Sequence, residues 1–90
     1  MPVEHDNSAL QGYVGMNARR LRERLGLPQD KLAASVGMSP SRYRAVEGGR
    51  VNLTLATLVR IADRLGVPAD LLLRPTRIVR RGPGRPKKRS

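Results

Sequence analysis

Glycine interrupts this sequence at short intervals, and that feature limits the chain to a set of short helices. Gly26, Gly37, the pair Gly48 and Gly49, and Gly66 each follow a stretch in which apolar residues recur at spacings of three and four. This spacing is the period of one helix face, and glycine is the residue that most often ends a helix. The sequence contains no stretch of strict apolar and polar alternation, which would indicate a strand. We therefore expect an all-α fold.

Five helices can be placed between these glycines. Pro28 and Pro40 suit the first turn of a helix, and Ser39 and Thr54 each supply a side-chain oxygen that can cap one. The helices are short and their joints are tight, so we expect a compact domain of about sixty residues with a small core, which a dimer interface would help to stabilise. The predicted inner faces consist of Val14, Ala18, Leu21 and Leu25; Leu32, Ala33 and Val36; Tyr43 and Val46; Leu55, Leu58, Ile61, Ala62 and Leu65; and the run 69–73.

Positive charge is concentrated at one end of the chain. Eighteen Lys and Arg against seven Asp and Glu give a net charge of +11. Residues 74–90 hold eight basic and no acidic residues, so this segment carries +8 and residues 1–73 carry +3. The segment is rich in Pro and Gly and poor in apolar residues, so we expect a basic tail that is disordered until it binds a partner. Residues 1–13 are expected to be a flexible arm. The excess of positive charge favours anionic polymers or anionic membranes as partners, and a solvated surface is the alternative.

Composition also excludes several classes of function. Cysteine is absent, and the single histidine, His5, lies in a polar stretch without a second ligand nearby. We expect no metal, no cofactor and no enzymatic activity, because the chain offers neither a nucleophile paired with a base nor a glycine-rich phosphate loop. No apolar run approaches the roughly 18 residues of a membrane span. The expected location is cytoplasmic, in association with the nucleoid.

The joint between the second and third helices has the spacing of a helix-turn-helix. Gly37 stands in the turn, and Ala33 is small enough to let two helix backbones approach. Val36, Met38 and Tyr43 are placed to lock the second helix of the pair against the first. An ordinary helical hairpin is the alternative, because glycine-containing turns also occur in simple bundles.

Several linked motifs extend this pattern over residues 14–73. They are Val14-Gly15, the run 19–27 followed by Gln29, Leu32-Ala33, Val36-Gly37-Met38-Ser39, Val46-Glu47 before Gly49, and Leu58 with the run 61–67. In these motifs the chain closely resembles the Cro/phage-repressor-like helix-turn-helix family, also called the xenobiotic-response-element family of bacterial regulators. The resemblance implies a five-helix DNA-binding domain, 14–73, that acts as a homodimer on a two-fold operator with its third helix in the major groove.

The resemblance also implies which residues read the bases. By position, Pro40, Ser41, Arg44 and Ala45 would face the major groove, with Arg42 toward one wall. Arg44 is the main candidate for specificity, because a guanidinium can donate two parallel hydrogen bonds to guanine. Pro40 would either touch a thymine methyl or simply start the helix. Ala45 offers only a methyl group, so direct readout is expected to be limited.

A second set of residues is placed to contact the DNA backbone. Gln29 matches the family position that clamps a phosphate and braces the third helix, although a solvated amide is the alternative. Pro28 stands where the family usually has a polar cap, which would change the reach of Gln29. Arg50, Asn52 and Thr54 lie near the start of the fourth helix and suit phosphate contacts, which fix register without reading sequence.

Arg22 and Glu47 correspond to a family ion pair between the first helix and the end of the third. We interpret this pair as structural and not as part of the DNA contact. A partly buried fork of this kind orients a helix but adds little net stability.

The tail contains a motif that resembles an AT-hook, an element that lies in the minor groove of A·T-rich DNA. The match is confined to Gly84-Arg85-Pro86 and its basic flanks, and Pro83 replaces the usual arginine before the glycine. Extended backbone and arginine suit a narrow minor groove. A nonspecific basic tail is the alternative, and in either case DNA is the partner. The candidate residues are Arg81, Arg85, Lys87, Lys88 and Arg89.

The sequence therefore predicts a DNA-binding transcriptional regulator, and the repressor role is the one we expect. Two alternatives stay open: a nucleoid-associated architectural protein, and the antitoxin of a toxin-antitoxin pair with a toxin as partner. Leu71, Leu72 and Leu73 are either a dimer seam or part of the core.

Overall fold

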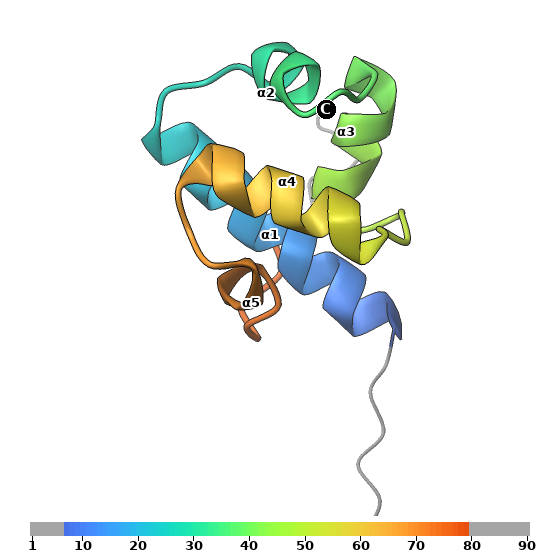
Figure 1. The fold of residues 1–90 in the computed structure, drawn as a ribbon. Helices are drawn as coiled ribbons and strands as arrows, with labels where there is room; N and C mark the ends of the chain where they lie inside the picture. Colours follow the sequence, from blue (N-terminus) through green and yellow to red (C-terminus); the bar gives the residue numbers. More distant parts are fainter. Residues whose placement is uncertain (1–6, 80–90) are drawn as a thin grey trace, which may run out of the picture.

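The computed structural model describes residues 7–79, which form five α-helices and no strand within that range. Helix α1 lies in the centre and contacts α3, α4 and α5, while α2 packs on α3 (Figure 1). The all-α fold predicted from the sequence is confirmed. The helices are α1 (Asn7–Arg24), α2 (Gln29–Ser35), α3 (Pro40–Glu47), α4 (Leu55–Leu65) and α5 (Ala69–Leu72).

The predicted caps fix where α3 and α4 begin. The Ser39 hydroxyl accepts a hydrogen bond from the Arg42 amide at 3.1 Å, and the Thr54 hydroxyl accepts one from the Thr57 amide, also at 3.1 Å. Each bond satisfies one of the amides that have no partner within the first turn of a helix. Pro28 precedes α2 in the N-cap position and supplies no side-chain cap, so α2 starts one residue later than the proline itself.

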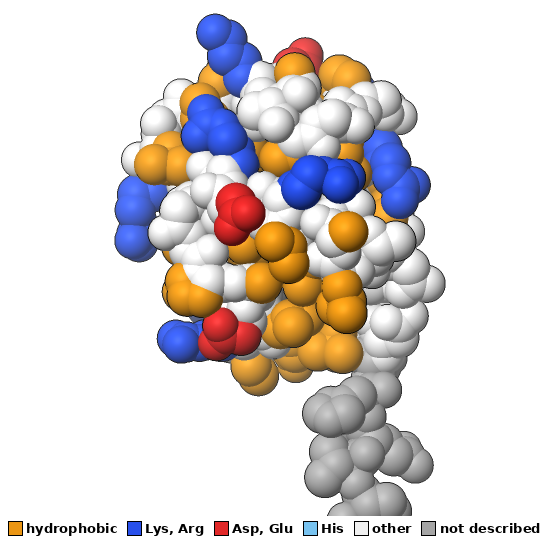
Figure 2. Space-filling model, in the orientation of Figure 1, with side chains coloured by type: hydrophobic (Ala, Val, Ile, Leu, Met, Phe, Trp, Pro, Cys, Tyr) orange, Lys and Arg blue, Asp and Glu red, His pale blue; other side chains and the backbone are white. Residues whose placement is uncertain are grey.

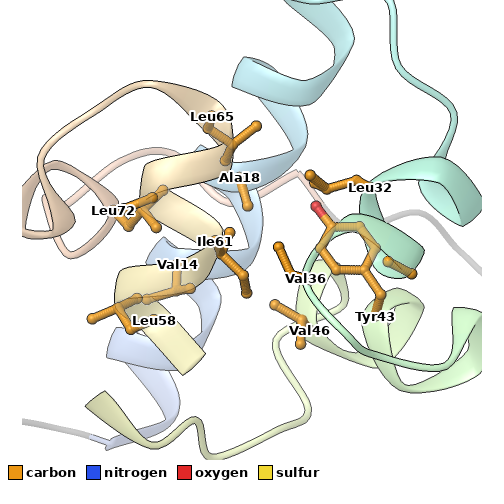
Figure 3. Close-up of a cluster of buried hydrophobic side chains, with 12 residues drawn as sticks. Val14, Ala18, Leu32, Val36, Tyr43, Val46, Leu58, Ile61, Leu65 and Leu72 are labelled. Atoms are coloured by element: carbon orange, nitrogen blue, oxygen red, sulfur yellow. The ribbon is translucent and has the colours of Figure 1, made fainter. Parts of the chain in front are cut away.

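A single hydrophobic core joins the five helices. Tyr43, Leu32, Ile61 and Leu72 are its largest fully buried side chains, and they come from four different helices (Figure 3). Most of the predicted inner faces are buried, but Leu21, Ala69 and Leu71 are only half-buried, and Leu25, Leu55, Asp70 and Leu73 are exposed. Leu25 is 51% exposed because it follows the last residue of α1, and Leu55 is 78% exposed because it is the first residue of α4.

Helix α1 is longer than predicted. It begins at Asn7, so residues 7–13 of the expected arm are helical. This first part of the helix is held by polar contacts with the loop after α3. The side-chain Oδ1 of Asn52 accepts hydrogen bonds from the side-chain amides of Asn7, at 2.8 Å, and Gln11, at 2.6 Å. Apolar spacing does not reveal contacts of this kind.

Part of the expected disordered tail also has a defined place. Residues 74–79 run as an extended segment along α1, where Asn17 and Arg20 donate hydrogen bonds to it. These bonds replace the apolar burial that the segment lacks. Residues 80–90, with the AT-hook-like motif and the candidates Arg81, Arg85, Lys87, Lys88 and Arg89, lie outside the described residues, as do residues 1–6.

Across residues 7–79, no helix has both the length and the apolar character needed to cross a membrane. The acidic side chains of the same range do not gather into a group that would hold a metal ion.

Candidate nucleic-acid interface

Helices α2 and α3 and the turn between them have helix-turn-helix geometry. Gly37 adopts a φ of 73°, a left-handed conformation that glycine reaches without strain. The Met38 amide then donates to the Ala33 carbonyl at 2.9 Å, which turns the chain sharply at the end of α2. Ala33 is fully buried, so its small side chain permits the close approach that the sequence predicts.

Helix α3 divides its residues between the core and the solvent. Tyr43 and Val46 are buried and anchor the helix. On the other side, the predicted base-reading residues Pro40, Ser41, Arg42 and Arg44 are exposed, and Ala45 is half-buried. An exposed polar face opposite a buried apolar one leaves the helix firmly seated while its outer side chains remain accessible.

Arg44 forms a weak ion pair in the protein without DNA. Its Nη1 lies 3.4 Å from Oδ1 of Asp30 in α2, and both side chains are at least half exposed. Exposed ion pairs of this kind contribute little, typically about 0–1 kcal/mol. The guanidinium is therefore able to leave Asp30 for a stronger acceptor.

The Glu47 carboxylate joins three helices at the end of α3. Nε and Nη2 of Arg22 in α1 donate to its two oxygens at 2.6 and 3.1 Å, and Nε2 of Gln29 in α2 donates to Oε1 at 2.9 Å. Arg22 also donates to the Leu27 carbonyl at 2.7 Å. The ion pair implied by the resemblance is thus present, and Gln29 braces α3 despite the unusual Pro28 before it.

Burial and hydrogen bonding act in opposite directions on this carboxylate. Burial alone would raise the pKa of Glu47, but the Arg22 guanidinium, the Tyr43 hydroxyl and the Gln29 amide beside the carboxylate together hold the pKa below its ordinary value. The hydrogen bond to Glu47 raises the pKa of Arg22. Burial beside Glu47 raises the pKa of the Tyr43 hydroxyl, which hydrogen-bonds none of the described residues. The ion pair of Arg22 and Glu47 is therefore fully charged at neutral pH.

The three predicted backbone contacts after α3 have different surroundings. Arg50 is exposed, and its guanidinium lies over Gly48. Asn52 is also exposed, but its side-chain oxygen is held by Asn7 and Gln11. The Thr54 hydroxyl caps α4. Asn52 and Thr54 therefore already use part of their hydrogen-bonding capacity within the domain.

The sequence matches the family described as Helix-turn-helix over residues 19–72. The chain belongs to the helix-turn-helix family. A relative named as an uncharacterized HTH-type transcriptional regulator of Sinorhizobium fredii is 41% identical over 67 residues, which are 74% of this chain and 87% of the relative.

Two solved structures resemble this helix-turn-helix protein. The hypothetical transcription factor NHTF from Neisseria superposes with a TM-score of 0.71 at 34% identity, over 83% of this chain and 87% of its own. The restriction-modification controller protein C.AhdI from Aeromonas hydrophila superposes with a TM-score of 0.69 at 32% identity, over 76% of this chain and 99% of its own.

Gly15 has a structural role in this helix-turn-helix domain that the predicted site did not include. A Cβ atom there would collide with the carbonyl oxygen of Val46 and lie 2.6 Å from that of Glu47. The backbone of α1 therefore touches the end of α3 directly. A glycine inside an otherwise helical pattern is the sequence signal for such an approach.

Proposed function

We propose that this protein binds operator DNA as a repressor, with the exposed face of α3 in the major groove. As a member of the helix-turn-helix family, the chain is a sequence-specific DNA-binding transcriptional regulator and not an enzyme. The observation that carries the finer proposal is the division of α3, in which Tyr43 and Val46 anchor the helix while Ser41 and Arg44 face solvent.

Arg44 is the residue we assign to base reading. Its guanidinium can exchange the weak contact with Asp30 for two parallel hydrogen bonds to guanine O6 and N7. Ser41 reads a neighbouring base edge, and Arg42 contacts the wall of the groove. Pro40 and Ala45 contribute only apolar contacts, so we expect few base pairs of the operator to be strongly specified.

Backbone contacts would hold α3 in register. Arg50 extends from the loop after α3, and the capped N-terminus of α4 at Thr54 presents the positive end of a helix dipole. Asn52 lies between them, and Gln29 sits at the start of α2 on the opposite edge of α3. The phosphates of the two DNA strands, which border the major groove on either side, are suitable partners for these residues.

Repression by occupation of the operator is the simplest mode for such a chain. Residues 7–79 form one small domain around a single core, and this described part contains no second module through which an effector or polymerase contact is apparent. The names of relatives, a transcriptional regulator and a restriction-modification controller, support a role in gene control. The cytoplasmic nucleoid is the corresponding place of action.

The test of base reading is selection of bound sequences from random DNA, followed by affinity measurements with two Arg44 variants. Arg44→Ala should lose about 1–3 kcal/mol of discrimination at one base pair. Arg44→Lys keeps the charge but not the planar fork, so it should lose discrimination while keeping the salt dependence of binding. An unchanged site preference in both variants would contradict the assignment, and broad A·T-rich coverage by the wild type would favour an architectural protein.

We also propose that the protein acts as a homodimer through the outer face of α4. Leu55 and Val59 lie one turn apart on this helix and are 78% and 46% exposed. Figure 2 shows the hydrophobic side chains of this face gathered over α4 and toward α5. Of the leucines considered for a dimer seam, Leu72 is fully buried and belongs to the core, whereas Leu73 is 36% exposed and lies at the end of α5.

A double variant tests this dimer. Leu55→Glu with Val59→Glu places two charges on the proposed interface, and it should sediment as a monomer at concentrations where the wild type is dimeric. Leu25→Glu is the matched control, because Leu25 is also about half exposed but lies in the turn after α1. A wild type that remains monomeric at high concentration and on two-fold DNA would contradict the proposal.

A further inference from the structure

One side-chain amide of α1 bonds both the end of α5 and the start of the segment after it. Nδ2 of Asn17 donates to the carbonyl oxygens of Leu71, Leu72 and Arg74 at 3.2, 3.0 and 3.0 Å. The last carbonyls of a helix have no partner within it. Asn17 thus caps α5 from the side and fixes the direction in which the chain continues.

The next residues, 74–79, form a strap along α1. Nη2 of Arg20 donates to the Arg77 carbonyl at 3.1 Å, and Nη1 of the same guanidinium donates to the Thr76 hydroxyl. The Val79 amide then donates to the Met16 sulfur at 3.4 Å. From Arg20 to Met16 the strap therefore runs back toward the N-terminus of α1.

The strap ends beside the part of α1 that faces the loop after α3. A Cβ atom on Gly12 would lie 2.5 Å from Cδ1 of Ile78, so the two residues are in close contact. The backbone of Gly12 also lies close to Gly49, because a Cβ atom added to Gly49 would lie 3.1 Å from the Cα of Gly12. Ile78 at the end of the strap and Gly49, the residue before Arg50 in this loop, therefore contact the same residue of α1.

The chain that follows the strap is strongly basic. Residues 80–90 contain six Lys and Arg and no acidic residue. Eleven residues reach at most about 36 Å when fully extended. The point from which they leave the domain therefore limits which DNA phosphates and which stretch of groove they can reach.

We propose that the strap is a positioning element: Asn17 and Arg20 hold residues 74–79 on α1 so that residues 80–90 meet the DNA beside the loop after α3. The inference rests on the proposed binding of α3 to operator DNA and adds a defined place for the tail on that same DNA. Without the strap, the basic residues would be tethered at Leu73, with a longer linker and no fixed direction, and their effective concentration at this flank would fall.

The absence of cysteine allows a direct test on the full-length chain. Ser90→Cys creates a single thiol, to which an iron chelate that cleaves nearby DNA can be attached. On an operator selected from random DNA, cleavage should be confined to one short stretch of base pairs in each half-site, on the flank next to the loop after α3. We call this stretch the cleavage window. In Arg20→Ala the window should broaden and its peak intensity should drop severalfold, while the footprint of the domain remains in place.

One control variant, Arg19→Ala, and one further test variant, Gly12→Ala, complete the design. Arg19→Ala removes the same charge from the neighbouring residue, whose partner is Glu23 and not the strap, so its window should match that of the wild type. Gly12→Ala displaces Ile78 and should broaden the window without removing any charge. Within residues 7–79, the Arg20 guanidinium donates its hydrogen bonds to strap residues, and a thermal melt of each variant verifies that the domain remains folded.

The outcomes separate this proposal from the one on which it rests. A clear domain footprint with the same sharp window in Arg20→Ala and the wild type would overturn the positioning role alone. A footprint with no window in the wild type would do the same. Failure of the wild type to protect any discrete site would overturn the proposed operator binding, and the positioning role with it.

Discussion

Arg22 and Glu47 form a two-pronged ion pair between α1 and the end of α3, with nitrogen to oxygen distances of 2.6 and 3.1 Å. The side chains are only 10% and 5% exposed, so both charges are largely removed from water. Gln29 adds a third hydrogen bond to the same carboxylate. The orientation of the helix proposed to read DNA therefore depends on polar groups that lie on its inner side, away from its exposed face.

Arg22→Ala should destabilise the domain strongly. It leaves the Glu47 carboxylate buried without its principal donor, and breaking a buried pair by removing one partner costs about 3–5 kcal/mol. Urea denaturation measures the loss, and DNA affinity should fall together with stability. Arg19→Ala is the control, because its exposed pair with Glu23 should contribute less than about 1 kcal/mol. Unchanged stability with lost binding would instead make Arg22 a direct DNA contact.

The depressed pKa of Glu47 predicts a loss of stability in acid. Because the pKa is lower in the folded than in the unfolded chain, the contribution is fully present above the unfolded value, near 4.3, and is lost as the pH falls through the folded value. Glu47→Gln should be less stable at pH 7 but lose less stability below about pH 5. Urea midpoints from pH 3 to pH 7 measure both slopes. Identical slopes would show that Glu47 has no role in the acid response.

Periodicity and capping signals predicted the helix-turn-helix and most of the core. Tyr43 and Val46 fall on the inner face of α3 because their spacing of three matches one helix turn, which is a local property. The start of α1 and the strap depend instead on hydrogen bonds between distant residues, such as Asn7 with Asn52 and Arg20 with Arg77. No local pattern contains that information.

Apolar spacing also failed to predict which side chains at helix ends are exposed. Leu55 has the correct spacing for the inner face of α4, yet it is the first residue of that helix and extends past its neighbours. Of the candidate site, the Arg22 and Glu47 pair came from the family resemblance alone. Their spacing of 25 residues carries no signal for contact.

Gly15→Ala should weaken the contact between α1 and α3. Alanine normally favours a helix interior over glycine by about 1 kcal/mol, but here its Cβ would collide with the Val46 carbonyl at the end of α3. Backbone atoms cannot move aside as a flexible side chain does, so we expect a net loss of about 1–3 kcal/mol by overpacking. Chemical denaturation measures it.

The control for Gly15→Ala is Gly26→Ala. Gly26 has open space around its Cα but a φ of 71°, so its substitution costs only the left-handed conformation, about 1–2 kcal/mol. DNA binding distinguishes the two sites further, because only the Gly15 variant displaces α3. Equal affinity in both variants, at temperatures where both are folded, would show that α3 tolerates the shift.

Tyr43→Phe should leave the domain at least as stable as the wild type. The ring of Tyr43 is fully buried close to Leu32 of α2 (Figure 3), but its hydroxyl makes no hydrogen bond with any residue from 7 to 79. A buried hydroxyl without a partner costs about 1–3 kcal/mol of desolvation, and phenylalanine removes that cost while it keeps the packing. Tyr43→Ala, which removes the ring as well, should cost about 3–5 kcal/mol.

Urea denaturation of Tyr43→Phe, with Tyr13→Phe as the control at a half-buried tyrosine of α1, measures the contribution of the hydroxyl. An unchanged or higher midpoint supports a hydroxyl that is only tolerated in the core. A free energy of unfolding lowered by more than about 1 kcal/mol would mean that the hydroxyl donates a hydrogen bond in solution. The neighbouring Glu47 carboxylate is the acceptor within reach, and the network that fixes α3 would then include a fourth residue.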